Sequence, residues 1–212
     1  MPQPKLQDAK DANKDVRELI KKKSGNKFQE TWTPDRKKKF KEVVQMLEDY
    51  AFETGGPDPD KDPIKYIEYV AKRAGEMQAG NCMQYACAAF ALLKKQGVAP
   101  LEVVGLMPSQ FVGHNFLILG RPADAPGTII ALEKYAGADS IFIVDGWANI
   151  GCAVKDYRKE WKDKLAKWAK AGKGTLHPFT NEKIAFEKGS GWPELFDDAK
   201  ESKLTFIGRF EG

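Results

Sequence analysis

The segment GNCMQYACAAFALLKK, residues 80–95, constrains the fold of this chain more than any other stretch. Its closely spaced alanines and apolar positions predict a helix from Asn81 to about Lys95. Because alanine side chains are small, this helix can approach neighbouring backbone closely, and we expect it to be buried at the centre of the fold. The same segment places a cysteine, Cys82, in the first helical turn.

Further helices are predicted on both sides of this segment. Thr33-Pro34 and Asp62-Pro63 each join a capping residue to a proline that suits the first helical turn. A later helix is predicted over residues 155–172, with a stripe containing Tyr157 and Trp161 that we expect to pack in the core.

Strands are predicted mainly after the central helix. Short β-branched runs bounded by Gly or Pro predict strands at 101–106, 114–120, 141–147 and 203–210, with a further short strand at 128–132. Helices followed by antiparallel-looking strands indicate an α+β fold, in which N-terminal helices and the central helix pack on an antiparallel sheet.

The chain has 212 residues, which fits one large domain with an extension. Residues 1–30 are polar and lysine-rich, with Val16, Leu19 and Ile20 as their only apolar cluster. We therefore predict that 1–30 is an N-terminal extension or secretion-related segment, a loosely attached helix with a tail. Residues 31–212 are predicted to form a single domain.

The net charge of +4 is modest, and much of it lies in two short runs, 21–23 and 36–39. We expect both runs to be solvated helix faces. No aromatic RNA-binding pattern, zinc-ligand spacing or helix-turn-helix signature accompanies them, so we expect no nucleic-acid partner.

The first residues lack the apolar run of a Sec signal peptide, and no stretch of the sequence is long and apolar enough for a membrane span. We expect the protein to be cytoplasmic, or to be secreted by a specialised route that requires no apolar signal. We also expect a monomer.

The three cysteines are Cys82, Cys87 and Cys152, an odd number at irregular spacings. They form no disulfide framework and no zinc-ligand pattern, and we expect neither a metal nor a cofactor. Cys87 and Cys152, the latter expected in a loop, have no predicted role. At a helix start, the thiol pKa of Cys82 is lowered by the helix dipole, and nearby backbone N–H groups can receive an oxyanion. The alternative is that Cys82 is only a small buried hydrophobe.

A thiolate nucleophile needs a base, and the sequence offers two histidines. His177 lies in a proline-bounded loop and has no predicted role, whereas His114 begins an apolar strand. Asp145 ends another apolar strand, where its carboxylate can accept the imidazole N–H, and Trp147 can shield the pair from water. The alternatives are that His114 has only a structural role and that Asp145 is only a turn residue. The order Cys, His, Asp along the chain favours a catalytic arrangement.

The motifs GNC at 80–82, GHNFLILGR at 113–121 and IVDGWAN at 143–149 resemble bacterial effectors and toxins of the papain-like and transglutaminase-like cysteine enzymes. The resemblance covers about residues 75–150. It implies a papain-like fold, with Cys82 as nucleophile, His114 as general base and acid, and Asp145 as the residue that orients the imidazole.

Two features depart from these relatives. Gln84 stands where related effectors often carry an acidic residue, and the connection from His114 to Asp145 is longer than in papain, so 121–140 should form an extended or extra-stranded connection. The resemblance suggests Gln78 as an oxyanion donor, with Asn81 and the Cys82 N–H as rivals.

The resemblance implies a protein substrate, such as a protein of a host cell. Deamidation of Gln or Asn side chains is favoured by the effector-like motifs. A cysteine protease and a transglutaminase use the same chemistry and remain open, because they differ only in the amide and the acceptor. The alternative of another class is a non-catalytic partner-binding domain.

Overall fold

The computed structural model describes residues 3–22, 27–29, 31–51, 56–106, 113–123, 130–135, 137–176, 183–187, 190–193, 195 and 203–212. Within these ranges the long helices are α1 (Leu6–Leu19), α2 (Pro34–Ala51), α3 (Pro63–Met77), α4 (Cys82–Lys95) and α5 (Val154–Lys170). None of them combines the length and the apolar character that crossing a bilayer requires.

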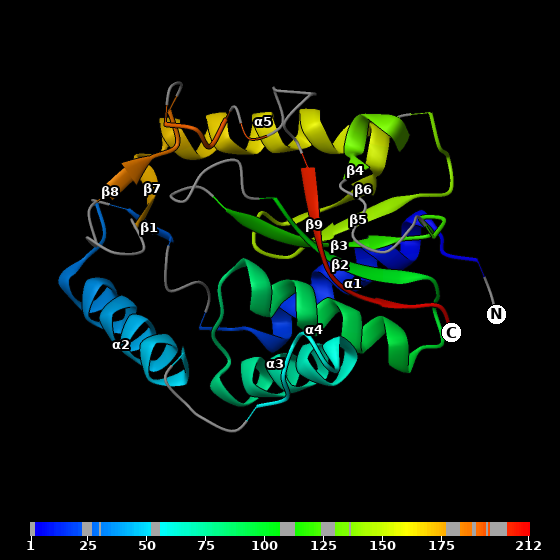
Figure 1. The fold of residues 1–212 in the computed structure, drawn as a ribbon. Helices are drawn as coiled ribbons and strands as arrows, with labels where there is room; N and C mark the ends of the chain where they lie inside the picture. Colours follow the sequence, from blue (N-terminus) through cyan, green and yellow to red (C-terminus); the bar gives the residue numbers. More distant parts are fainter. Residues whose placement is uncertain are drawn as a thin grey trace.

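The predicted α+β class is confirmed. The main sheet has six antiparallel strands in the order β4-β9-β2-β3-β5-β6 (Figure 1). Their bounds are Ile130–Ala131 for β4, Lys203–Phe210 for β9, Leu101–Leu106 for β2, His114–Leu119 for β3, Phe142–Asp145 for β5 and Ile150–Ala153 for β6. β4 and the 3-10 turn η1 (Leu132–Tyr135) lie in the long connection between β3 and β5.

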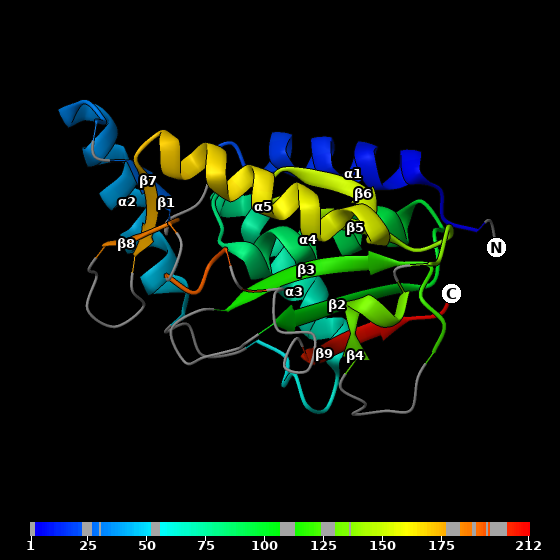
Figure 2. The ribbon, with the colours of Figure 1, turned by 90° about the horizontal axis from the view of Figure 1, so that it is seen from above.

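Two hydrophobic cores lie on opposite faces of this sheet. Helices α3 and α4 cover one face, and α5 lies across the other (Figures 1 and 2). β3 divides its side chains between the two cores, because successive residues of a strand point to opposite faces: Phe116 and Ile118 join the α5 side, whereas Leu117 and Leu119 join the α4 side.

Helix α4 is buried, as its alanines predict. Ala86, Ala88 and Ala89 are each no more than 1% exposed, and the helix packs between α3, α1 and the sheet. The cap of α3 is also as predicted, since the Asp62 carboxylate accepts a hydrogen bond from the Lys65 N–H at 3.1 Å.

The loose attachment expected for the N-terminal helix is wrong. Ala9, Ala12 and Val16 of α1 are buried against β6, β5 and α4. At Gly151 in β6, an added Cβ would lie 2.9 Å from the Ala9 carbonyl oxygen, so the glycine allows the helix to approach the sheet closely. The prediction counted only large apolar residues and overlooked the two alanines, which complete a helical stripe with Val16.

A small second sheet has the order β1-β7-β8, formed by Lys27–Gln29, Lys173–Leu176 and Lys183–Ala185. It lies beside α2 at one end of the molecule (Figure 1). None of its strands was predicted, because strands of three or four residues are too short to show a periodic pattern.

Two predicted assignments near the end of β5 are also wrong. The predicted strand over 141–147 ends at Asp145, so Trp147 lies in the turn between β5 and β6 rather than on a strand. Cys152, expected in a loop, lies on β6 and is 9% exposed. In both cases Asp145 and Gly146 start a tight turn, and the chain returns immediately as β6.

Candidate active site

Three elements bring the predicted residues Cys82, His114 and Asp145 to one place. Cys82 is the first residue of α4, His114 is the first residue of β3, and Asp145 is the last residue of β5. Because β3 and β5 are antiparallel neighbours, the end of β5 lies beside the start of β3. His114 Nε2 lies 2.8 Å from Asp145 Oδ2, and both side chains are buried.

Asp145 accepts two further hydrogen bonds. The Tyr157 hydroxyl donates to Oδ2 at 2.9 Å, and the Ala148 N–H donates to Oδ1 at 2.9 Å. Burial alone would raise the pKa of Asp145, but the charge and hydrogen bond of His114, with these two donors, lower it. The carboxylate is therefore ionised and has its lone pairs largely satisfied.

The remaining ring nitrogen of His114, Nδ1, is buried, and no described residue forms a well-aligned hydrogen bond with it. It is the nitrogen left to face the Cys82 thiol, because Nε2 is held by Asp145. The two groups shift each other's pKa. Burial opposes the charged form of His114, but Asp145 and Cys82 together raise its pKa to about 9.

The thiol of Cys82 is activated in the same way. Burial opposes the thiolate, but the neighbouring His114 imidazole and its positive charge, assisted by Asn115, bring the pKa of Cys82 below its ordinary value. The arrangement thus favours a thiolate beside an imidazolium.

Asn115 is a site residue that the sequence analysis missed. Its Nδ2 donates to Cys82 Sγ at 3.4 Å. Since residues alternate along β3, Asn115 points to the α4 face, where α4 begins. Gly105 is paired with it on β2, and an added Cβ there would lie 2.7 Å from Asn115 Oδ1. A polar amide within the otherwise apolar run HNFLIL was the signal available in the sequence.

The start of α4 is held by Gln84. The Asn81 N–H donates to Gln84 Oε1 at 2.9 Å, and a Cβ at Gly80 would lie 2.5 Å from Gln84 Cβ. Glutamine suits this third helical position, where its side chain caps the N-terminus of the helix together with Asn81.

The three predicted oxyanion donors lie in different settings. Gln78 is the C-cap residue of α3. It is exposed and has a left-handed backbone conformation with φ of 54°. The Asn81 N–H is occupied by Gln84. The Cys82 N–H is at the first helical position and therefore has no partner within its own helix. It belongs to the same residue as the nucleophilic sulfur.

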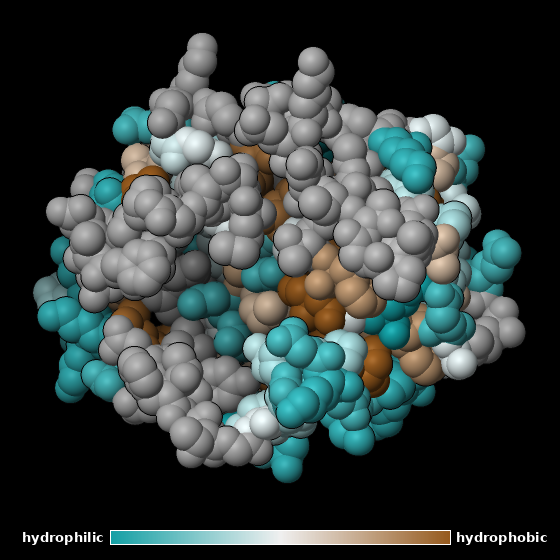
Figure 3. Space-filling model, viewed as in Figure 1, coloured by the Kyte–Doolittle hydropathy of each residue, from teal (hydrophilic) through white to brown (hydrophobic). Residues whose placement is uncertain are grey.

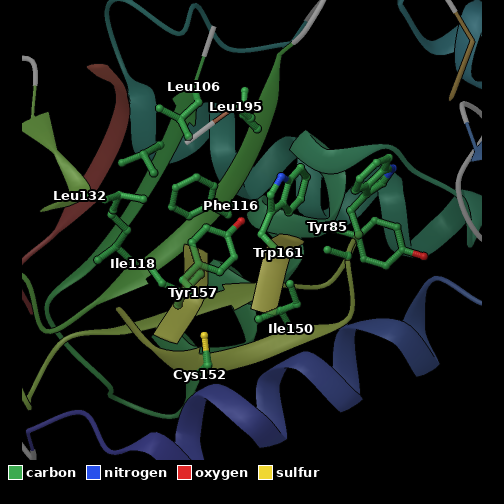
Figure 4. Close-up of a cluster of buried hydrophobic side chains, with 14 of the residues drawn as sticks. Tyr85, Leu106, Phe116, Ile118, Leu132, Ile150, Cys152, Tyr157, Trp161 and Leu195 are labelled. Carbon is green, nitrogen blue, oxygen red and sulfur yellow. The ribbon is translucent and has the colours of Figure 1, made fainter. Parts of the chain in front are cut away.

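Aromatic rings surround the imidazole. The ring centres of Trp161 and Trp147 lie 4.6 Å and 5.1 Å from that of His114, and both tryptophans are fully buried. Figure 4 shows Phe116, Tyr157 and Trp161 gathered in the same cluster. These rings keep water from the His114–Asp145 pair, which strengthens the interaction between them.

The other cysteines lack this activation. All three are free thiols, but burial raises the pKa of Cys87 strongly and that of Cys152 to about 12. His177 lies outside the described residues. Within the described ranges, no group of three or more His, Cys, Asp or Glu side chains is arranged to hold a metal ion.

Comparisons with protein-family models, with curated proteins and with solved structures found no match for this chain.

Proposed function

We propose that this chain is a cysteine hydrolase of the papain-like or transglutaminase-like type, which deamidates Gln or Asn side chains of a target protein. The observation that carries the proposal is the position of His114, between the Asp145 carboxylate at 2.8 Å and the Cys82 thiol, whose pKa it lowers. A buried ion pair beside an activated thiol is typical of catalytic sites and is unusual for a structural cysteine.

In the first step, the Cys82 thiolate attacks the carboxamide carbon, and a C–S bond forms while the carbonyl electrons move to oxygen. The Cys82 N–H at the start of α4 stabilises this oxyanion in the proposed mechanism. The C–N bond then breaks, and the His114 imidazolium gives its proton to the departing nitrogen. Ammonia leaves, and the acyl group remains as a thioester on Cys82.

In the second step, His114 is neutral and takes a proton from water as the water oxygen attacks the thioester carbon. The C–S bond breaks, the thiolate of Cys82 returns, and the side chain is released as a carboxylic acid. Asp145 stabilises the imidazolium in both steps and fixes which ring nitrogen faces the sulfur.

The effector-like motifs around Cys82 and Asp145 favour a bacterial effector or toxin that acts on a host protein. The experiment is to expose candidate host proteins to the wild-type chain or to Cys82→Ala and to analyse them by mass spectrometry. A Gln-to-Glu or Asn-to-Asp change that needs Cys82 supports the deamidase.

Other outcomes assign another activity. New chain termini would identify a cysteine protease, and larger conjugates would identify a transglutaminase. If Cys82→Ala and the wild type leave every substrate equally unchanged while binding a partner equally well, the chain is a non-catalytic binding domain.

A further inference from the structure

A cleft of about 920 Å³ separates α2 from the body of the protein. Helix α2 forms one wall, and α1, β1, α5 and β7 contribute to the other (Figures 1 and 2). Among the described side chains that line it, lysines and arginines outnumber carboxylates by eight to two. Figure 3 shows hydrophilic side chains along the outer edge of the molecule near α2. The runs expected to be solvated helix faces thus contribute to a concave, cationic site.

Three cations of the body wall donate to carbonyl groups of one turn. Arg17 Nη1 lies 3.1 Å from the Gly146 oxygen, Lys164 Nζ lies 3.3 Å from the Asn149 oxygen, and Lys27 Nζ donates to the Trp147 oxygen. None of the three forms an ion pair with a carboxylate in the described ranges. Hydrogen bonds to backbone carbonyl groups thus take the place of paired carboxylates at these three side chains.

These charges repel one another. Burial lowers the pKa of Lys27 to about 7, and the neighbouring charges of Arg17, Lys173 and Lys164 act in the same direction, against the attraction of Asp145. The pKa of Lys164 is also lowered, by burial and then by Arg17. An anion in the cleft would relieve this repulsion.

We infer that the cleft between α2 and the body binds a small polyanion that carries several phosphate groups. Its volume lies within the range of about 300–1,000 Å³ that is usual for small-molecule sites. Closely spaced phosphates match this density of lysine and arginine better than peptide carboxylates, which are separated by backbone.

Nucleic acid fits the cleft less well. Single strands bind by stacking bases on open aromatic faces. Here the guanidinium of Arg36 lies 4.8 Å from the centre of the Trp32 ring, and Lys27 Nζ lies 4.7 Å from that of Trp168. The two tryptophans that line the cleft already have cations over their rings.

Binding should draw α2 towards the body. The apolar contact of α2 in the described ranges is small, with Val43 and Met46 packed near Met77 and Ala79. Arg36 and Lys39 extend from α2 into the cleft, opposite the cations of the body. A polyanion that bridges the two walls would add an attraction between α2 and the body, and would stabilise the folded chain.

The test is calorimetric titration of the full chain with inorganic tripolyphosphate, without divalent cations. We expect binding that is lost or weakened by about 30-fold or more in Arg36→Glu/Lys39→Glu, because two charge-assisted contacts are replaced by repulsion. The matched control is Lys37→Glu/Lys41→Glu, which changes the same charge on exposed positions of α2 outside the cleft. It should retain binding within about threefold.

A second pair of variants tests the other wall. Lys21→Glu/Lys22→Glu should weaken binding, whereas Lys10→Glu/Lys14→Glu, on exposed positions of α1 outside the cleft, should not. Thermal unfolding without ligand verifies that each variant is folded. Among the variants, tripolyphosphate should raise the melting temperature of the two control variants and not that of the two cleft variants.

The proposal is overturned if tripolyphosphate does not bind, or if cleft and control variants lose affinity equally. It is also overturned if heptaglutamate or a short single-stranded oligonucleotide binds more tightly than tripolyphosphate in the same buffer, since the cleft would then serve an acidic peptide or a nucleic acid. No residue mutated here belongs to the Cys82 site, so the outcome is independent of the proposed hydrolase activity.

Discussion

His114 Nε2 and Asp145 Oδ2 lie 2.8 Å apart at the junction of β3 and β5, and neither side chain is exposed to solvent. A buried charge whose partner is removed is strongly destabilising, because nothing replaces the lost solvation. The pair is therefore held together whether or not a substrate is present, and the imidazole is oriented before any reaction begins.

Asp145→Asn tests this relationship, since asparagine keeps the shape of the side chain but removes its charge. Without the carboxylate the pKa of His114 should fall from about 9, and less imidazolium should be available to stabilise the Cys82 thiolate. We expect alkylation of Cys82 by iodoacetamide at pH 7 to slow by about tenfold or more, a change equivalent to about 1.4 kcal/mol. Mass spectrometry of the modified cysteine gives the rate. An unchanged rate would show that Asp145 does not tune the site.

The three cysteines should differ sharply in reactivity. Cys82, with its lowered pKa, should be alkylated near neutral pH, whereas Cys87 and Cys152 have raised pKa values and should react only after unfolding. His114→Ala should raise the pH at which Cys82 reacts. Peptide mapping after brief alkylation from pH 5 to 9 measures all three at once. Equal rates for Cys82 and Cys87 in the folded chain would contradict the assignment.

Long elements with clear end signals could be predicted from the sequence. Pro34 and Pro63 begin α2 and α3 as expected, and 203–210 forms β9 with its predicted bounds. The packing of α1 was missed because its buried stripe consists largely of alanine. The short strands β1, β7 and β8 were missed because they contain too few residues for a pattern.

The candidate site, like the fold, could be predicted only in part from the sequence. Cys82, His114 and Asp145 could be found because each stands at a helix or strand end, where a polar residue needs an explanation. Their catalytic role stays a prediction. Tyr157 was interpreted as part of a core stripe, and it does lie there, but its hydroxyl reaches Asp145. Helical spacing identifies the face on which a tyrosine lies and not the partner of its oxygen.

Tyr157→Phe should isolate that hydroxyl, because the ring is kept. Loss of one of the donors to Asp145 should raise the pKa of the carboxylate and destabilise the fold by about 1–2 kcal/mol. Tyr85→Phe is a suitable control, since the Tyr85 hydroxyl donates to the Ile20 carbonyl at 3.5 Å and not to Asp145. Urea unfolding gives the stability of both variants, and the alkylation rate of Cys82 should fall in neither, because the Asp145 carboxylate keeps its charge beside His114. Slowing in both variants would indicate a general loss of packing.

Asn115→Ala should raise the pKa of Cys82, because the thiolate loses a hydrogen-bond donor at 3.4 Å. Gly105→Ala should act in the same direction without contacting Cys82, since its Cβ would displace the Asn115 side chain. We expect each change to slow alkylation at pH 7 by about threefold to tenfold. The double variant should be no slower than Asn115→Ala alone, because both changes remove the same contact. Additive effects would show that Gly105 acts through another neighbour.

The pH dependence of stability should reveal the thiolate. In the unfolded chain His114 has its ordinary pKa of 6.5, and folding raises this to about 9, so its contribution is complete below pH 6.5 and is lost as the pH rises through 9. Folding lowers the pKa of Cys82, and a lowered pKa contributes stability that grows as the pH rises. The two effects oppose each other in the wild type, because the folded chain gains a proton on His114 and loses one from Cys82.

Removing the thiol should therefore make stability more sensitive to pH. In Cys82→Ala only the His114 contribution remains, because Asp145 is the main group that raises the pKa of His114. The free energy of unfolding should therefore fall between pH 6.5 and 9 more steeply than in the wild type. Urea denaturation at pH 6.0, 7.5 and 9.0 would measure both slopes, about 1.4 kcal/mol per pH unit being the limit for one proton. The double variant His114→Gln/Cys82→Ala lacks both groups. Its free energy of unfolding should not show the steeper fall with pH that is expected of Cys82→Ala. Parallel curves for Cys82→Ala and the wild type would mean that the folded chain holds Cys82 as a neutral thiol.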